Sequence, residues 1–550
     1  MIPGRVGRVL RTVRHLRPRQ VFAQIAYAAR RGVAPVQLAG TAPRLGLQRP
    51  CAPFLGAPAH ARWDGERRIR LIGREVHFAE AIDWDTRDQG PLWAYHLHQF
   101  DYVRHPTLPA AARGALLLDW IERHPKGQGW NPHPISLRTL SWGKLLLDPD
   151  TLGLDAAANE RVRYSLACQV ETLDRNLEVR LQANHLFSNL LAVVFAGLLF
   201  EGEAADRWLR RERALRRELG EQVLADGLHI ERTPMYHALL LENVLDLLNV
   251  ARAAGARAPA ELTGELEHCA ARMLGALRVL THPDGRIALF ADSAFEIAHE
   301  PATLEGYASA LDVGLRPPAR EGVLDAGGYV RLAAGPYVLI ASVAGPMPSY
   351  QPGHAHCDAL GFELSVAGER VVTDTGVAEY VPGARRDTAR ATSSHATLML
   401  GGQEQAETWA AHRIGGRPQV VLERVEPGCS AEARCVAWAT PDTVHHRRLS
   451  VAADGVAIHD RISGVGRTVR FTLPLAPGLE PRVERGPDGA MRALVALAKG
   501  GELELTLPEG VDFRVESAAY FPEFGSELER ACLVGETATF GEGCLRLTLR

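Results

Sequence analysis

The densest group of side chains that could do chemistry lies in the segment YQPGHAHCD, which contains His354 and His356. These two histidines are two residues apart, so on an extended strand both imidazoles would point to the same face. A carboxylate at Asp374 and a third imidazole at His395 follow further along the chain. Zn²⁺ binds nitrogen and carboxylate ligands of this kind in tetrahedral sites. The pattern predicts a metal site, and histidines that are simply hydrogen-bonded on a polar strand face are the open alternative.

Three further polar clusters stand next to apolar segments in the first half of the chain. They contain Asn184 with His185, then Tyr236, and finally His98 followed by Arg138. Taken singly, each has a structural explanation, for example Asn184 as a helix N-cap and Tyr236 as an aromatic side chain at an interface. Together they predict a cleft rich in amide, imidazole, aromatic and guanidinium groups, which suits a carbohydrate that carries carboxylates.

The elements that position these clusters are helical from about residue 85 to residue 310, because apolar residues there recur with the helical period. The apolar run Leu186–Phe200 is shorter than the roughly 20 residues of a membrane span, so we expect a buried core helix and no transmembrane segment. The clearest helical segments are Ala111–Arg123, Ala156–Leu181, Leu186–Phe200, Ala204–Leu224, Tyr236–Ala254 and Ala260–Val279.

From about residue 325 the apolar period changes to two, which is typical of half-buried strands. Hairpin turns are expected at 366–370 and 452–456. The clearest strand segments are Tyr329–Leu332, Tyr337–Ser342, Leu360–Val366, Glu369–Thr373, Leu449–Ile458, Val469–Leu473 and Glu502–Leu507.

Because helices come first and strands afterwards, the chain predicts an α+β multidomain protein and not alternating βαβ units. We expect a basic lead-in over residues 1–84 and a helical domain of stacked hairpins over residues 85–315. An antiparallel β-sandwich is expected over residues 325–550.

The composition excludes several classes of protein. The 62 Lys and Arg residues nearly balance the 65 Asp and Glu residues, and the formal net charge is −3. That balance argues against a nucleic-acid-binding protein, which needs a strong basic excess. Eight cysteines with no C-x-x-C pair argue against a disulfide scaffold.

The N-terminal segment is basic, with an arginine at every third position from Arg5 to Arg14 and no acidic residue nearby. This spacing places the arginines along one face of a helix, with apolar residues partly opposite. Two interpretations stay open: contact with anionic lipid or an acidic polymer, and a solvated basic helix that leads into the first domain. Because no apolar stretch typical of a secretory signal follows, we expect a cytoplasmic location, with a periplasmic one open.

Four short strings then point to a family. They are NHLFSN from Asn184, ERTPMYH from Glu231, YQPGHAHCD from Tyr350 and SHAT from Ser394. In their order and spacing these strings resemble the bacterial heparinase II/III-like polysaccharide lyases, and the resemblance covers about residues 85–460. It implies an N-terminal (α/α) toroid followed by a C-terminal antiparallel β-sandwich, in agreement with the change of period.

The resemblance implies cleavage of the bond to O4 of a uronic acid by β-elimination. Asn184 would hydrogen-bond the uronate carboxylate, so that negative charge can spread into it as C5 is deprotonated. Tyr236 would take the C5 proton or give a proton to the leaving O4, and His354 would be the complementary base or acid, depending on the epimer at C5. The expected substrate-binding residues are His185, His98, Arg138, Arg232 and Arg390.

The resemblance also implies a bound divalent metal, with zinc as the expected ion. Its ligands would be His356, Asp374 and His395. A closed ligand shell of this kind is typical of structural zinc, so the ion would brace the strands behind the site and would not touch the substrate.

The sequence therefore predicts an enzyme, a polysaccharide lyase, whose partner is an anionic polysaccharide, either a glycosaminoglycan or an exopolysaccharide. Two alternatives stay open. One is a non-catalytic anionic-glycan-binding protein of exopolysaccharide production. The other is a metal-dependent hydrolase with an open site formed by His354, His356 and Asp374. The sequence does not specify the polymer or the oligomeric state.

Overall fold

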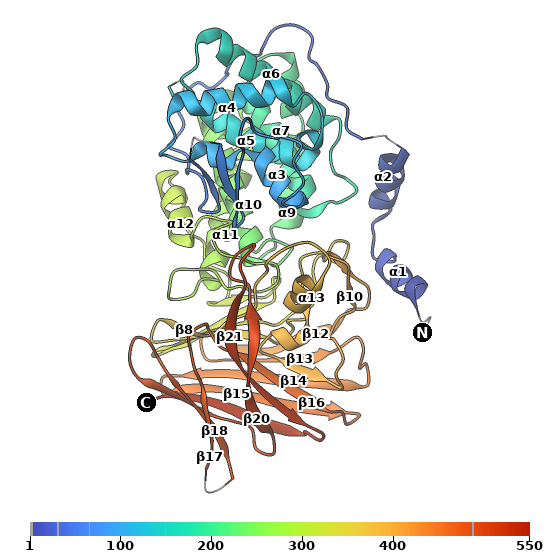
Figure 1. The fold of residues 1–550 in the computed structure, drawn as a ribbon, viewed down its shortest axis with the longest axis vertical. Coiled ribbons are helices and arrows are strands. Elements are labelled where there is room, and N and C mark those ends of the chain that lie inside the picture. The colour runs from blue at the N-terminus through green and yellow to red at the C-terminus, as the bar shows by residue number, and fades with distance from the viewer. Residues whose placement is uncertain (1–3, 30–31, 65–66, 149, 487–488) are drawn as a thin grey trace.

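The computed structural model describes residues 4–29, 32–64, 67–148, 150–486 and 489–550. Helices fill the N-terminal region and strands the C-terminal region, and the two regions stack along the long axis of the molecule (Figure 1). The α-helices are α1 (Arg5–Val13), α2 (Pro18–Ala29), α3 (Pro91–Gln99), α4 (Ala110–Arg123), α5 (Pro132–Leu146), α6 (Ala156–Asp174), α7 (Ala183–Leu199), α8 (Glu203–Leu209), α9 (Glu212–Gln222), α10 (Pro234–Ala254), α11 (Ala260–Val279), α12 (Pro301–Ala310) and α13 (Ala384–Arg390). Short 3₁₀ turns are η1 (Asp101–Arg104), η2 (Gln128–Trp130), η3 (Gly255–Arg257) and η4 (Thr392–Ser394).

Helices α7 and α10 form the centre of the helical region. Nearly every side chain of α7 is buried, as expected for a helix that is apolar on all sides. It packs against α5, α8, α9 and α10. The predicted core helix over Leu186–Phe200 is therefore confirmed, with its first turn beginning earlier, at Ala183. Among the described residues, no helix combines the length and the apolar character that crossing a membrane requires.

The C-terminal region contains three large antiparallel sheets. Their strand orders are β4-β5-β6-β7-β8, β12-β13-β14-β15-β22-β19-β18-β17 and β20-β21-β16-β9. The strands of these sheets are β4 (Val323–Leu324), β5 (Tyr329–Ala334), β6 (Tyr337–Ser342), β7 (Phe362–Val366), β8 (Glu369–Val372), β9 (Leu398–Leu400), β12 (Gln419–Glu426), β13 (Ser430–Val436), β14 (Thr443–Ala452), β15 (Gly455–Gly464), β16 (Val469–Pro474), β17 (Arg482–Arg485), β18 (Met491–Ala496), β19 (Glu502–Thr506), β20 (Asp512–Tyr520), β21 (Leu528–Thr537) and β22 (Glu542–Leu549). Smaller sheets pair β1 (Ala61–Trp63), β2 (Arg68–Leu71) and β3 (Arg74–His77), and β10 (Thr408–Trp409) with β11 (Arg413–Ile414).

One apolar core is shared by the three large sheets. It includes Leu364 from β7, Ile458 from β15 and Leu533 from β21, all of which are buried. Alternating burial along β14, where every second side chain is buried, explains the period of two that the sequence carries.

Several predicted elements end differently in the structure. The segment Ala204–Leu224 is broken into α8 and α9, and the predicted helix over Ala156–Leu181 ends at Asp174. The segment Leu449–Ile458 is not one strand but the tight end of the β14–β15 hairpin. The alternation of apolar residues continues across this turn, so a period of two does not show where β14 ends and β15 begins. The two predicted hairpin turns are confirmed, at the ends of β7–β8 and β14–β15.

The segment with His354 and His356 lies in irregular chain between β6 and β7, so its prediction as a strand is wrong. Pro348 and Pro352 precede the histidines and have no N–H to donate to a ladder. Instead, the carbonyl of His354 accepts a hydrogen bond from the backbone N of Asp292 at 3.0 Å. That bond ties the segment to the helical region.

Candidate active site

Two of the predicted catalytic residues lie in the first turns of neighbouring helices. Asn184 is the second residue of α7, and Tyr236 is the third residue of α10. The Thr233 hydroxyl caps α10 by accepting a hydrogen bond from the backbone N of Tyr236 at 3.3 Å. Helix N-termini carry partial positive charge, so two of them at one site favour a negatively charged group.

Asn184 and Tyr236 line one cavity of about 140 Å³. The helical region also contributes His96 and His133 to its wall, while Tyr380 and Phe524 come from the β-rich region. The cavity is therefore formed where the two regions meet, and neither region contains it alone.

His354 stands beside these two residues, so the structure brings all three predicted catalytic side chains together. The rings of Tyr236 and His354 are 4.3 Å apart between centroids. Glu231 connects the group, because its Oε2 accepts a hydrogen bond from Nδ2 of Asn184 at 3.1 Å and lies 3.8 Å from Nε2 of His354. An amide, a phenol and an imidazole thus lie close together, with Asn184 and Tyr236 in the wall of the cavity and His354 against Tyr236.

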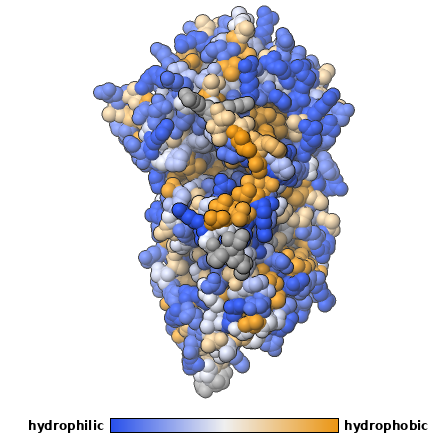
Figure 2. Space-filling model, turned by 90° about the vertical axis from the view of Figure 1, so that its right-hand side faces the viewer, coloured by the Kyte–Doolittle hydropathy of each residue, from blue (hydrophilic) through white to orange (hydrophobic). Residues whose placement is uncertain are grey.

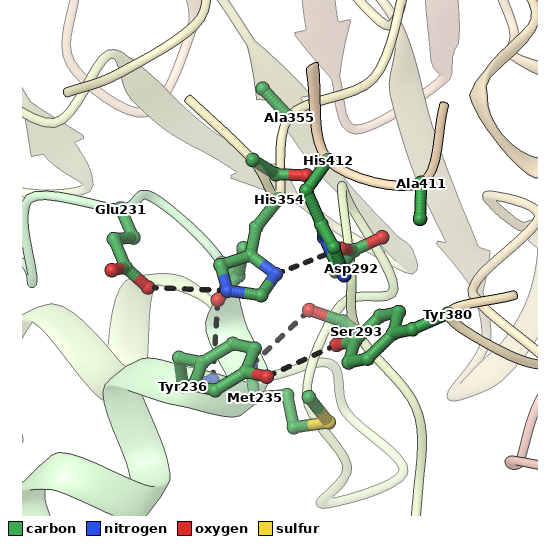
Figure 3. Close-up of polar contacts among 12 residues, drawn as sticks. Glu231, Met235, Tyr236, Asp292, Ser293, His354, Ala355, Tyr380, Ala411 and His412 are labelled. Carbon is green, nitrogen blue, oxygen red and sulfur yellow. Dashed lines mark hydrogen bonds and ion pairs between the residues drawn. The ribbon is translucent and has the colours of Figure 1, made fainter. Parts of the chain in front are cut away.

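His354 is held from behind by Asp292, as Figure 3 shows. Oδ2 of Asp292 lies 2.8 Å from Nδ1 of His354, and Oδ1 lies 2.8 Å from Nε2 of His356. Arg386 pairs with the same carboxylate and is fully buried with it. Burial acts to raise the pKa of Asp292, but the Arg386 guanidinium and the two histidine hydrogen bonds outweigh it and hold that pKa well below its usual value.

This arrangement fixes the tautomer of His354. A carboxylate only accepts hydrogen bonds, so Nδ1 of His354 carries the proton that faces Asp292. In the neutral ring Nε2 is then bare, on the side where Glu231 and Tyr236 lie. The geometry is that of a general base oriented by a carboxylate.

Tyr236 is hydrogen-bonded to a second tyrosine. Its hydroxyl lies 3.2 Å from the hydroxyl of Tyr380. Burial raises the pKa of Tyr236, and the Tyr380 hydrogen bond offsets only part of that effect. The phenol is therefore protonated at neutral pH and is ready to act as a proton donor.

His185 lies at the edge of the same site. Its Nδ1 is 3.1 Å from Oε2 of Glu178, and its ring is 4.5 Å from the ring of His133. Burial acts to lower the pKa of His185, but the Glu178 carboxylate outweighs it and the pKa is raised. A protonated imidazole next to Asn184 would attract an anionic sugar.

The substrate-binding prediction is corrected for Arg138 and His98, which are both completely buried. The guanidinium of Arg138 donates to the carbonyl of His98 at 2.7 Å and to the carbonyl of Gly129 at 2.8 Å. It also lies over the ring of Trp120, and Nε1 of Trp120 donates to Nδ1 of His98. These groups connect elements inside the helical region.

The same correction applies to Arg232 and Arg390. Arg232 donates to the carbonyls of Gly327, Gly328 and Gly345, which ties the start of α10 to the β-rich region. Arg390 donates to four backbone carbonyls, those of Ala355, Ala410, Ala411 and Arg413. These guanidinium groups are buried, they donate to backbone carbonyls, and none of them lines the cavity beside Asn184 and Tyr236.

The three predicted metal ligands also lie together. Ligand atoms of His356, Asp374 and His395 are all within 4.8 Å of one another, and all three residues are buried. Nδ1 of His356 and Nε2 of His395 have no hydrogen-bond partner among the residues that the structure describes. The other nitrogen of each ring faces a carboxylate, that of Asp292 or Asp374, so the unpartnered nitrogens carry lone pairs.

Two buried imidazoles and a buried carboxylate fit a divalent cation such as Zn²⁺. The Asp292 carboxylate on Nε2 of His356 is the usual support of a metal-binding histidine. His354 belongs to a different group, with Asp292 and His412. An open hydrolase site made of His354, His356 and Asp374 is therefore not supported.

Sequence reasoning missed Asp292, Arg386, Glu231 and Tyr380 as site residues. Asp292 had a usable signal, because it is a lone acid in the apolar run IALFADSAF, and a charge in such a run is expected to be buried and paired. Arg386 and Tyr380 had no signal in the sequence, since only the folded chain brings Arg386 to Asp292 and Tyr380 to Tyr236.

Two family models match the chain, one in each region. Residues 164–312 match the heparinase II/III N-terminus, and residues 316–536 match the heparinase II/III-like C-terminal model. No curated protein sequence matches the chain significantly.

Solved structures with the same fold include a heparinase III, at 16% identity and a TM-score of 0.66, covering 86% of this chain and 79% of that one. A second heparinase III structure aligns at 18% identity and a TM-score of 0.61, over 86% of this chain and 81% of the other. The heparan sulfate lyase HepC from Pedobacter heparinus aligns at 18% identity and a TM-score of 0.58, over 88% and 81%.

The chain thus has the heparinase III-like fold, with a helical N-terminal region and a β-rich C-terminal region. The two matched spans together cover more than half of the chain, one in each region. The protein belongs to the heparinase II/III-like family.

Proposed function

We propose that the protein is a polysaccharide lyase that cleaves a uronic-acid-containing glycan by β-elimination. The observation that carries this proposal is the proximity of Asn184, Tyr236 and His354, with Glu231 between the amide and the imidazole. Membership of the heparinase II/III-like family supports the same reaction class.

Neutralising the uronate carboxylate is the first requirement, because the C5 proton is only weakly acidic beside a carboxylate anion. One N–H of the Asn184 amide donates to Glu231, and the other is left to donate to the substrate carboxylate. The N-termini of α7 and α10 and the imidazole of His185 add positive potential. These groups act where charge accumulates as the proton leaves C5.

The proton transfers follow from the tautomer of His354 and the protonated phenol of Tyr236. Nε2 of His354 takes the C5 proton, the electron pair of that bond forms the C4=C5 double bond, and the C4–O4 bond breaks. The Tyr236 hydroxyl gives its proton to O4 as it leaves. The products are an unsaturated uronate and a free hydroxyl, and no water is consumed.

We further propose that His356, Asp374 and His395 hold a divalent metal, with zinc as the ion. When bound there, such an ion would supply structural cross-linking between the segments that carry its ligands. Because Asp292 contacts both His354 and His356, the metal ligands and the proposed base share one support.

We also propose that the helices close into an (α/α) toroid and that the facing sheets form a β-sandwich. The proposed division is 1–84, 85–315 and 325–550. The core shared by the three sheets and the change from α12 to β4 support this division.

The test is a panel of uronic-acid polysaccharides, namely heparan sulfate, hyaluronan, glucuronan and alginate, incubated with the full-length protein. A lyase produces the ultraviolet absorbance of a C4=C5 double bond conjugated to the carboxylate. Reducing ends that form without this absorbance would indicate a hydrolase. Saturable binding without either product would indicate a glycan-binding protein, and both outcomes contradict the proposal.

Replacing Asp292 tests the support of the base. An Asp292→Asn variant is expected to lose about 10- to 100-fold in kcat with a smaller change in KM, because the base loses its orientation while the sugar contacts remain. Steady-state kinetics on the best substrate of the panel measure both constants. Asp284→Asn is the matched control, since Asp284 pairs with Arg370 away from the cavity and should leave both constants unchanged. Full kcat in Asp292→Asn contradicts the assignment.

A further inference from the structure

The N-terminal segment, residues 4–29, lies along one side of the molecule as two helices, α1 and α2 (Figure 1). We call it the strap. Polar contacts hold it to the body: Nε of Arg11 donates to Glu407 at 2.8 Å, and Arg17 pairs with Glu221 at 2.6 Å. Gln20 is buried and donates to the carbonyl of Tyr350 at 3.4 Å. The strap is therefore attached to both the helical and the β-rich region.

A helix on the surface of a globular protein normally packs its apolar face on the core. In α1 the apolar face is exposed instead. At 100° per residue, Val6, Val9, Leu10 and Val13 share one face. Gly7 lies at the flank of that face, and Arg11, which pairs with Glu407, lies opposite it. Gly7 is the buried residue of the helix, while Val6 is 68% exposed and Leu10 is 52% exposed. The apolar face of α1 thus points to solvent.

Helix α2 repeats this arrangement. Its buried residue is the polar Gln20, while Phe22 is 72% exposed and Ile25 is 64% exposed. Eight of the fourteen exposed large hydrophobic residues in the described part of the chain lie in the strap. Figure 2 shows an orange band on this side of the molecule. A band of this kind marks an interaction surface, because isolated exposed residues do not gather in this way.

The charge of the strap selects the partner. No Asp or Glu occurs before Asp64, while arginines recur through the strap. Arg5 and Arg14 are exposed and lie on either side of the apolar face of α1. Arginine side chains beside an apolar face can reach lipid phosphates while the apolar groups enter the acyl boundary.

We propose that the strap docks the protein on an anionic membrane surface. A carboxylated or sulfated glycan would use the arginines but would leave Val6, Phe22 and Ile25 in water. A second copy of the chain would bring two basic straps together, which is unfavourable. A bilayer with anionic headgroups satisfies both the apolar and the basic features. This proposal goes beyond the lyase assignment and does not depend on it.

The experiment is co-flotation of the full-length protein with vesicles of phosphatidylcholine, either pure or containing about one quarter phosphatidylglycerol. We expect the protein to float with the anionic vesicles and to release as salt is raised. A Phe22→Ser/Ile25→Ser double variant is expected to lose at least about tenfold in vesicle binding. An Arg5→Gln/Arg14→Gln variant should bind more weakly and depend less on salt.

The matched control is Val421→Ser/Val515→Ser, which removes two exposed valines from β12 and β20, outside the strap. It should bind vesicles like the unmodified chain, and thermal unfolding should show every variant folded. Absence of vesicle binding by the unmodified chain overturns the proposal, as does equal binding by Phe22→Ser/Ile25→Ser. Strap-dependent retention on heparin without vesicle binding would assign the strap to glycan. Strap-dependent self-association in sedimentation, again without vesicle binding, would assign it to a second copy.

Discussion

A Tyr236→Phe variant is expected to lose eliminative turnover by about 10³-fold, the range expected when a positioned acid is removed. Without the hydroxyl, O4 must leave as an alkoxide or take its proton from water. The aromatic ring, which packs 4.3 Å from the ring of His354, stays in place. The folded state should lose only about 1 kcal/mol, because one hydrogen bond, to Tyr380, is removed.

The measurement is the initial rate of ultraviolet absorbance on the best substrate, together with substrate binding and thermal unfolding of the variant. Tyr380→Phe is the matched control, since it breaks the same hydrogen bond from the other side and keeps the Tyr236 hydroxyl. It should retain most of the turnover. Equal losses in the two variants would assign the effect to the hydrogen bond, and full turnover in Tyr236→Phe would contradict the role of Tyr236 altogether.

The sequence predicted the site residues at the starts of helices better than the site residues in the irregular chain between elements. Asn184 and Tyr236 immediately precede or begin apolar helical runs, so their place in the first turns of α7 and α10 could be predicted. Their meeting follows from the packing of α7 against α10. The long apolar runs of both helices made this part of the fold predictable from the sequence.

The supports of the site could not be predicted, because they come from distant segments. Asp292 contacts His354 and His356 from the irregular chain between β6 and β7, and Arg386 from α13. No spacing in the sequence encodes such a meeting. The expected strand for the two histidines was also wrong, yet both still face one carboxylate, since the irregular chain turns both rings toward Asp292.

The substrate-binding arginines were misassigned for a physical reason. A guanidinium has five N–H donors and satisfies buried carbonyls as well as it satisfies an anionic ligand. Arg138 in α5 and Arg390 at the end of α13 are used inside the fold in this way. Residue type alone does not distinguish an arginine that binds backbone carbonyls from one that binds a ligand. The burial of the side chain in the folded protein does.

Loss of the metal is expected to have the largest effect on stability. The purified protein should contain about one divalent ion per chain, because His356, Asp374 and His395 form a fully buried group whose ligand atoms lie within 4.8 Å of one another. An ion that binds only the folded state stabilises it by about 4 kcal/mol at a free concentration about a thousandfold above its Kd. A strong chelator should therefore lower the Tm, and added zinc should restore it.

A His356→Ala variant separates the metal from simple packing. It should lower the Tm and also abolish the response to the chelator, because the site loses one of its three ligands. His445→Ala is the matched control, since His445 is equally buried and pairs with Asp460 at 2.7 Å. That variant should also unfold earlier, but the chelator should still lower its Tm. Purified protein without a divalent ion, or the same chelator response in both variants, would remove the metal from this site and leave Asp374 and His395 as a buried ion pair.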